Sequence, residues 1–306
     1  TTTGMNNAVF VKNNIIGSST AGNEIGNRGI RISNSQNVLV ESNTVYGFRN
    51  NSTTIQTTGI EFSANVINSK ISRNLIYDLF YTGTTNRAGQ GISVSTVANA
   101  EVEISNNVIH SMKGHGSATA LNNSWGIMLM AGSKINVYHN SISISETFGN
   151  AATNIHGGFY IAAAVSDVNI LNNVVSSAGA FGVFYNIYSL APNTAFTSLN
   201  NNVYYRNLPE PASTTYHIGF IGGSARTTLG DWKTASTLDV LTFESNPMFT
   251  SNTDLTINSG TTPTVLESGA VVIAGLNVDF NGVSRPAPAP VNGGGTAPDI
   301  GAYEFD

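Results

Sequence analysis

The chain has 306 residues, of which 41% are hydrophobic and only 10% are charged. This apolar content supplies a large core and excludes a disordered chain, while the formal net charge of −5 argues against nucleic acid as a partner, because phosphate binding needs a basic face. The chain has no cysteine, which excludes disulfides, thiolate metal sites and cysteine nucleophiles, and it has no apolar run of ~18 residues that would span a membrane.

The first residues carry no targeting signal. The sequence begins at Thr1 without a Met, a basic segment or an apolar segment, so we expect a mature or excised piece of an exported protein. A more unusual feature is the presence of 39 asparagines. Asn is disfavoured in helices and ordinary strands but favoured in turns and in stacked amide ladders. The composition therefore predicts repeated short strands joined by tight turns.

One short segment recurs seven times through the first two thirds of the chain. It reads VFVKNNII at 9–16, VEISNNVI at 102–109 and VNILNNVV at 168–175, and its last copy, TSLNNNVY at 197–204, is degenerate. If each repeat is one coil, identical positions stack, so the shared Asn is predicted to form an internal ladder. The ladder asparagines are spaced by 29 to 33 residues, and they are Asn14, Asn43, Asn74, Asn107, Asn140, Asn173 and Asn202.

A second sequence motif precedes most of these copies. It is a Gly followed by alternating apolar residues, as in GIRIS from Gly29 and GIEFS from Gly59, with a weaker copy, GVFYN, from Gly182. Alternation with period two excludes helical repeats, and the repeat is too short for propeller blades of about 40 residues. In a parallel β-helix, strands of successive coils stack about 4.8 Å apart. We therefore predict an all-β fold, a parallel β-helix of about seven coils over residues 1–207.

The remaining residues, 208–306, lack the repeat. This segment has few alternating strands of its own, so we predict that it caps the last coils and forms one continuous domain with them. TTLGDWKTAS at 227–236 has the start signals of one short helix, and the ending IGAYEF predicts a final strand. Residues expected to pack on the body are Trp232, Phe243, Phe249 and Tyr303.

Two further features of this segment concern its Pro-rich part. RPAPAP at 285–290 is polyproline-like and cannot pair in a sheet, and NGGGT at 292–296 predicts a flexible turn. Arg285 is expected to hold this part down by bonding a backbone carbonyl, Asp279 or Asp299.

The repeat GIxI…NVxIxNNxI resembles that of the right-handed parallel β-helix of pectate-lyase-like proteins. The tail, through VDFNGVSRP at 278–286 and APDIGAYEF at 297–305, is similar to the C-terminal portion of bacterial surface β-helix proteins called choice-of-anchor Q domain proteins. In that family this ending closes the helix and an anchoring segment usually follows, and Asn281 stands where the family often has Asp. The resemblance implies a right-handed helix and an extracellular or bacterial cell-surface location. It does not imply an activity, because such proteins include enzymes and scaffolds.

The outward positions of the Gly-led strands are the first candidates for binding. Ile30 and Ile32 point inward, so Arg31 points outward, and its predicted equivalents are Glu61, Ser93, Met128, Tyr160 and Phe184. Arg31 and Glu61 lie one coil apart and favour a surface ion pair. The apolar residues of this outward row, Met128, Tyr160 and Phe184, either form a sugar-stacking platform or are covered by loops.

Long segments between the coils are the second candidate. The segments 46–58, 77–90, 110–125 and 146–157 carry aromatic residues, among them Trp125. They either form one wall of a groove or cover an apolar outward stripe at Ile15, Leu75, Val108 and Val174. The predicted ligand-binding residues are therefore Arg31, Glu61, Met128, Tyr160, Phe184 and Trp125.

Signals for catalysis and metal binding are few. Gly114-His115-Gly116 matches a triplet of polygalacturonase-like enzymes, which makes His115 the one catalytic candidate, but the paired Asp and the Arg-x-Lys motif of those enzymes are missing. Glu61, Glu101 and Glu103 do not form a cluster on one face, and the histidines share no metal-ligand spacing, so no metal site is predicted. Asp279–Gly282 is either an Asx turn or a fragment of a calcium loop, which leaves calcium open.

These features favour a non-catalytic secreted or cell-surface scaffold. It would serve as an adhesin, a stalk or a glycan-binding module, with an extracellular glycan or a surface protein as its partner and no cofactor. One alternative is a polysaccharide lyase or glycoside hydrolase that acts in a groove beside the Gly-led sheet. Another is a subunit or cargo of a larger bacterial surface or secretion assembly. The enzyme would require three carboxylates, or a carboxylate pair with Arg or Lys, in one groove.

Overall fold

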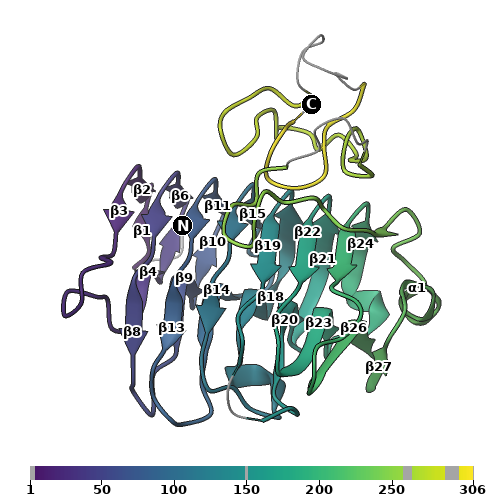
Figure 1. The fold of residues 1–306 in the computed structure, drawn as a ribbon. Coiled ribbons are helices and arrows are strands. Elements are labelled where there is room, and N and C mark those ends of the chain that lie inside the picture. Colours follow the sequence, from purple (N-terminus) through teal and green to yellow (C-terminus); the bar gives the residue numbers. More distant parts are fainter. Residues whose placement is uncertain (1–3, 149–150, 258–263, 287–295, 306) are drawn as a thin grey trace.

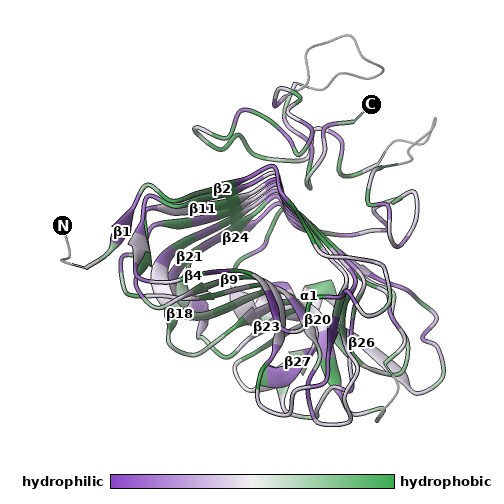
Figure 2. Ribbon diagram, turned by 90° about the vertical axis from the view of Figure 1, so that its left-hand side faces the viewer, coloured by the Kyte–Doolittle hydropathy of each residue, from purple (hydrophilic) through white to green (hydrophobic). Residues whose placement is uncertain are grey.

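The computed structural model describes residues 4–148, 151–257, 264–286 and 296–305, and most of them wind into a β-solenoid of about seven turns (Figure 1). Strands one turn apart pair in parallel, as Ile71 does with Val40 on one side and with Ile104 on the other. Strands of successive turns therefore superimpose when the molecule is seen along its axis (Figure 2). The predicted parallel β-helix is confirmed.

The Gly-led sheet is one side of the solenoid. Its motif glycines are required by a close approach across the core, because a Cβ on Gly59 would lie 2.6 Å from Cγ2 of Ile76, and one on Gly126 would lie 2.5 Å from Cγ2 of Ile142. The strands of this sheet are β4 (Arg28–Ile32), β9 (Thr57–Ser63), β14 (Gly89–Ser95), the first part of β18 (Trp125–Tyr138), β20 (Ile155–Ile161), β23 (Gly182–Ser189), β26 (Thr214–Ile221) and β27 (Ser224–Arg226).

Two further sheets are formed by the repeat segments, one on each side of the ladder Asn. The second sheet precedes it and contains β2 (Phe10–Lys12), β6 (Leu39–Glu41), β11 (Ser69–Ser72), β15 (Val102–Ser105), the last part of β18, β21 (Val165–Leu171) and β24 (Phe196–Asn200). The third sheet follows it and contains β3 (Ile15–Ile16), β7 (Thr44–Val45), β12 (Leu75–Ile76), β16 (Val108–Ile109), β19 (Ser141–Ile144), β22 (Val174–Ser177), β25 (Val203–Arg206) and β28 (Phe243–Glu244).

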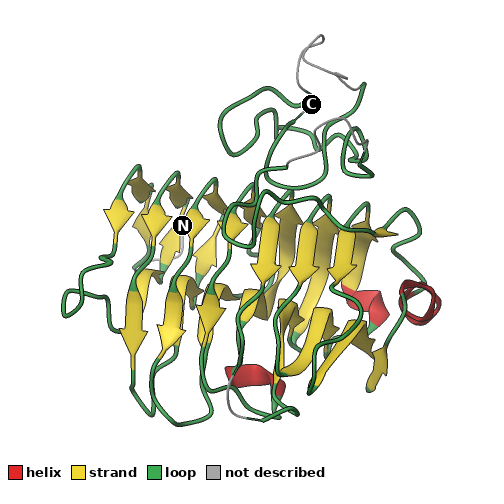
Figure 3. Cartoon of the chain, in the orientation of Figure 1, coloured by secondary structure: helices red, strands yellow, loops and turns green. Residues whose placement is uncertain are grey.

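Short strands complete the early turns. One three-stranded sheet consists of β1 (Asn6–Asn7), β5 (Ser35–Gln36) and β10 (Val66–Ile67), and another of β8 (Phe48–Asn50), β13 (Leu79–Tyr81) and β17 (Met112–Lys113). Helical structure in the described residues is limited to α1 (Leu229–Ser236) and to single 3-10 turns at Ala120–Asn122 and Asn193–Ala195 (Figure 3). No helix of the described ranges is long and apolar enough to cross a membrane.

The predicted asparagine ladder is present. Asn74, Asn107, Asn140 and Asn173 are fully buried, and each donates its backbone N–H and its Nδ2 to the Oδ1 of the ladder Asn in the next turn, at 2.9 to 3.1 Å. The ladder ends at Asn202, which donates instead to Thr242 and Asp239.

The residue before each ladder Asn has a left-handed backbone. This conformation turns the chain from the second sheet into the third, and Asn adopts it more readily than most residues because its short side chain can bond locally. The requirement accounts for the Asn-Asn pairs in four of the seven copies. The left-handed residues are Asn13, Ser42, Arg73, Asn106, His139, Asn172 and Asn201.

The register of β23 corrects one prediction. Phe184 was expected to follow Tyr160 in the outward row, but Phe184 pairs with His156 and is fully buried, whereas Tyr160 pairs with Tyr188. The weaker motif copy misleads because its Gly182 is not the structural equivalent of the motif Gly. That position is taken by Asn186, whose amide donates to two backbone carbonyls, those of Val175 and Tyr205.

The last turn is closed by residues 208–245. Trp232 of α1 is fully buried, as predicted, and its indole N–H donates to Asp239 at 2.7 Å. The same carboxylate accepts from Asn202 and Tyr204, which joins the cap to the ladder. The expectation for Phe243 was wrong: its side chain remains 40% exposed, because β28 adds to the edge of the third sheet and turns this ring outward.

The described residues after 245 do not cover the end of the solenoid but lie along its side, against the third sheet (Figure 1). They bury the outward apolar stripe: Leu255 and Ala302 pack with Val108, and Leu266 and Ile300 pack with Val174. This segment, and not the loops between coils, therefore covers the later part of that stripe. Phe249 and Tyr303 contact these clusters as partly buried residues, and no strand is formed by IGAYEF.

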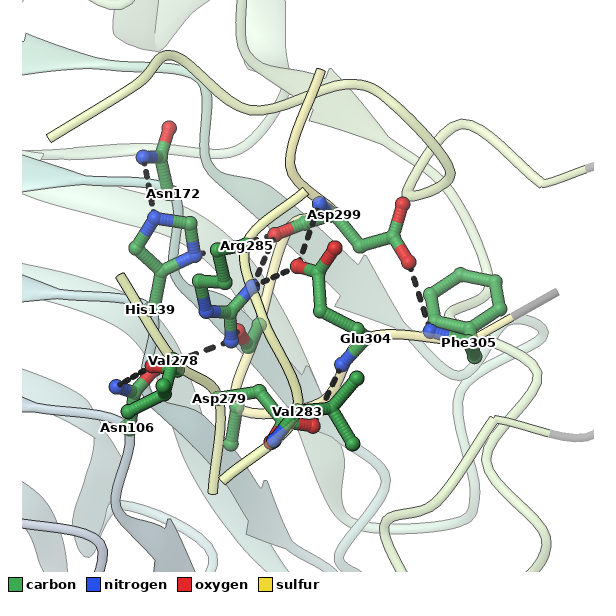
Figure 4. A network of polar contacts seen from close by, with 12 residues as sticks. Asn106, His139, Asn172, Val278, Asp279, Val283, Arg285, Asp299, Glu304 and Phe305 are labelled. Carbon is green, nitrogen blue, oxygen red and sulfur yellow. Dashed lines mark hydrogen bonds and ion pairs between the residues drawn. The ribbon is translucent and has the colours of Figure 1, made fainter. Parts of the chain in front are cut away.

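Arg285 fastens this segment to the solenoid (Figure 4). Its guanidinium donates to the backbone carbonyls of Asp299 and Gly301, pairs with Glu304, and reaches Asn106 of the fourth turn at 3.1 Å. The expected bond to a backbone carbonyl is confirmed. Most of the Pro-rich and Gly-rich stretches, residues 287–295, lies outside the described residues.

Candidate functional site

A cleft of about 170 Å³ opens on the outer face of the Gly-led sheet. It crosses three successive turns, because its floor consists of Arg28, Thr58 and Gln90, which are neighbours in the strand register. Glu61 and Ser93 continue the floor, and the apolar side chains of Met128 and Met130 close one end.

One wall of this cleft is the 3-10 turn Ala120–Asn122. Three side chains hold its carbonyl groups: the amide of Gln90 donates to Leu121 at 3.3 Å, that of Gln56 donates to Asn122 at 3.3 Å, and the indole of Trp125 donates to Ala120 at 2.7 Å. The loop wall is therefore positioned by the sheet. This is the groove geometry expected when an inter-coil segment leaves on one side of the stack.

The floor combines a charged pair with hydrogen-bonding groups that have no protein partner. Glu61 pairs with Arg28 and lies 3.5 Å from the Nε of Arg31, so the surface ion pair predicted for Arg31 and Glu61 is present. No hydrogen bond within the described ranges involves Oγ1 of Thr58 or Oε1 of Gln90, although both residues are largely buried, at 2% and 5% exposed. They line the cleft, so a ligand that presents hydroxyls would reach them at its floor.

An aromatic cluster continues from Met128 along the same face. Tyr160 and Tyr188 stack with 5.9 Å between centroids, and Tyr188 and Phe220 stack with 4.3 Å between them. Their ring planes are within 9° of parallel, so these rings cover one another from turn to turn. Burial, and then the neighbouring Tyr188, raise the pKa of Tyr160, so its phenol stays protonated at neutral pH.

The structure thus separates the predicted ligand-binding residues. Glu61 and Met128 line the cleft, and Arg31 lies at the Glu61 ion pair. Trp125 and Tyr160 belong with Met128 to the aromatic cluster, but they are not among the residues that line the cleft. Sequence reasoning missed Gln56, Thr58 and Gln90, because nothing but the cross-turn register brings them together.

His115 lies elsewhere. It lines a cavity of about 420 Å³ beside the three-stranded sheet of β8, β13 and β17, together with Phe80, Tyr81 and Lys113. None of the described residues that line this cavity carries a carboxylate. The arrangement offers His115 no acid partner for general acid–base chemistry.

Several acids carried by the coils are paired with cations on neighbouring turns. Glu103 pairs with Lys70 at 3.2 Å, Glu101 pairs with Lys134 at 3.3 Å, and Glu41 pairs with both Lys12 and Arg73. Within the described ranges, no three His, Asp or Glu side chains lie close enough to hold a metal ion. At Asp279, the carboxylate accepts from the backbone N–H of Val283, four residues on, at 2.7 Å and from that of Glu304 at 3.0 Å, so its oxygens hold the backbone of this segment and do not form the two-residue bond of an Asx turn.

Fold and cleft together define a β-solenoid with an asparagine ladder and a small polar cleft on its Gly-led sheet. Comparison with protein-family models, with curated proteins and with solved structures found no match for this chain.

Proposed function

We propose that the chain is a non-catalytic, secreted or surface-displayed scaffold that binds neutral carbohydrate in the cleft of the Gly-led sheet. The observation that carries the proposal is the grouping of Thr58 and Gln90, whose side-chain oxygens have no hydrogen-bond partner within the described ranges, with Glu61 and the apolar Met128. Sugar hydroxyls donate to carboxylate and amide oxygens, and the C–H face of a sugar ring packs on apolar side chains. The cleft is small, so it suits one sugar unit of a chain that extends beyond it.

The paired acids support the non-catalytic part of the proposal. Hydrolysis of glycosides needs two carboxyl groups on either side of the bond, and lyases need a base with cationic or metal assistance. In the cleft the one carboxylate is Glu61, and Arg28 and Arg31 already neutralise it. A lyase or hydrolase is therefore the less favoured alternative.

A binding experiment tests the proposal. The protein is screened against immobilised neutral oligosaccharides, and hits are measured by calorimetry for the unaltered chain and for Gln90→Ala. We expect a loss of affinity of tenfold or more, because this amide both holds the wall and faces the ligand. Gln36→Ala, which removes an amide from β5 outside the cleft, is the matched control. The proposal is contradicted if no glycan binds, or if the unaltered chain and Gln90→Ala bind the glycan with equal affinity. Release of new sugar ends would indicate the enzyme.

A further inference from the structure

A second cavity lies on a different side of the molecule, between the third sheet and the segment that follows residue 245. Its volume is about 390 Å³, and its floor is apolar, formed by Leu75, Val108 and Leu255. The two walls come from parts of the chain far apart in sequence. The solenoid supplies Tyr77 and His110, and the C-terminal segment supplies Asp254 and Tyr303.

Aromatic rings stand on both walls. Tyr77 stacks on His110 with 5.2 Å between centroids and 16° between planes, and Tyr46 stacks on the other face of Tyr77 at 5.0 Å. On the opposite wall, Tyr303 is held by an edge contact with Phe280 at 5.2 Å. The cavity is therefore bounded by rings whose positions are fixed by packing.

The cavity has a single charge, and that charge is negative. Asp254, a solvent-exposed residue, is its one charged lining residue, and none of the ion pairs within the described ranges includes it. The carboxylate is oriented by Thr256, whose backbone N–H and hydroxyl both donate to Oδ1, at 3.1 and 2.7 Å. Burial raises the pKa of Tyr303 to about 12, and the nearby charge of Asp254 contributes to this increase.

His110 does not neutralise this charge. Burial lowers the pKa of His110 to about 4, in spite of an opposite effect of Asp254, so the ring is neutral at pH 7. Its Nδ1 contacts the hydroxyl of Ser111 at 3.0 Å. At neutral pH the cavity is therefore anionic, aromatic and apolar at once.

We propose that this cavity binds a small organic cation that carries a methylated ammonium group. A carboxylate without a counter-ion selects positive charge. Tyr46 and His110 cover both faces of Tyr77, so the ring of Tyr303, together with the apolar floor, selects a weakly hydrated cation over a metal ion. One carboxylate is also too few ligands for a divalent metal. The site is distinct from the carbohydrate cleft, which lies on the Gly-led sheet.

Choline and its uncharged isostere 3,3-dimethylbutan-1-ol are the probes. Both are titrated into the full chain, and binding is followed by NMR through the Tyr77 and Tyr303 ring signals. We expect choline to bind and the isostere to bind at least tenfold more weakly. Asp254→Asn keeps an oxygen for Thr256 but removes the charge, so it should lower the affinity for choline at least tenfold and leave that for the isostere unchanged.

Two variants complete the experiment. Tyr303→Leu should weaken choline binding while keeping an apolar wall, because it removes the ring that faces the cation. Asp167→Asn, which removes an acid from the second sheet outside the cavity, should bind choline like the unaltered chain. The proposal fails if choline does not bind, if the neutral isostere binds equally well, or if Asp254→Asn retains full affinity. None of these outcomes bears on carbohydrate binding at the Gly-led sheet, so the two proposals fail separately.

Discussion

Asn107 and Asn140 lie one turn apart and share two hydrogen bonds, because the backbone N–H and the Nδ2 of Asn107 both donate to the Oδ1 of Asn140, at 3.0 and 2.9 Å. Asn74 makes the same pair of bonds to Asn107. Each ladder residue thus accepts twice from one neighbour and donates twice to the other.

The first prediction follows from this sharing. Asn107→Ala removes the acceptor of two buried donors of Asn74, so we expect the free energy of unfolding to fall by about 1–3 kcal/mol. Urea unfolding followed by circular dichroism measures the change. Asn51→Ala, at an exposed loop position, is the control and should be nearly neutral. A loss for Asn107→Ala no larger than that of the control would show that the ladder does not stabilise the fold.

The second prediction concerns His156, which is fully buried and stacked on Phe148 with 3.6 Å between centroids. Neither ring nitrogen has a hydrogen-bond partner in the described part of the chain, and burial lowers the pKa of His156 to about 3. Below pH 6.5 the unfolded chain binds a proton at this residue and the folded chain does not. Stability should therefore fall with falling pH, by about 1.4 kcal/mol per pH unit until the folded pKa is reached.

His156→Phe isolates this effect from other titrating groups. The variant keeps a ring against Phe148 but cannot take up a proton. The difference in unfolding free energy between the two proteins should shift by about 2 kcal/mol in favour of the variant between pH 6.5 and 4.5. Chemical denaturation at several pH values measures it, and parallel pH profiles would contradict the assignment.

The third prediction concerns Arg285, whose pairing with Glu304 is buried (Figure 4). Arg285→Met leaves a buried carboxylate without its cation, which costs about 3–5 kcal/mol. We expect the segment after residue 245 to detach before the solenoid unfolds. Limited proteolysis with mass spectrometry should show early cuts in this segment of Arg285→Met. Arg285→Lys keeps the positive charge and should be cut there less often. Unchanged proteolysis of Arg285→Met would contradict the anchoring role.

The fourth prediction concerns the cap. A chain that ends at residue 207 loses Asp239 and Thr242, the acceptors for Asn202, and exposes the free edges of β23 and β25. Open strand edges pair with other chains, so we expect assemblies in size-exclusion chromatography with light scattering. A monomeric truncated chain with undiminished stability would show that this region is not a cap.

The fifth prediction is the absence of cleavage of polygalacturonate and related acidic glycans. The motivation is the cavity at His115, which no carboxylate lines. Absorbance of unsaturated products is the measurement, with and without calcium. Calcium-dependent product release that His115→Ala abolishes would establish an enzyme.

The sequence repeat was sufficient to predict the turns of the solenoid and the ladder. A side chain that recurs at one position of a parallel stack must meet its own copies, so Asn74 and Asn107 could be placed against each other without a structure. Where a copy departs from the repeat, the same reasoning fails: at β23 the motif Gly is replaced by Asn186, and the outward row was continued through Phe184 instead of Tyr188.

The candidate sites were less accessible to sequence reasoning. The cleft depends on Gln56 and Gln90, which lie on adjacent turns and reach the same 3-10 turn. The cavity beside Tyr77 depends on Asp254 and Tyr303, in a segment without periodicity. Local patterns predict secondary structure and its repetition, but they do not specify where a non-repetitive segment docks.

The ladder also bears on how the length of such a scaffold can change. Its internal members are chemically alike, since each accepts from one side and donates to the other, whereas its last member meets Asp239 and Thr242. A duplicated stretch of 33 residues between Asn107 and Asn140, whose separation is one such repeat, would present the same groups at both of its junctions. The protein could therefore lengthen by whole turns while both of its ends stayed the same.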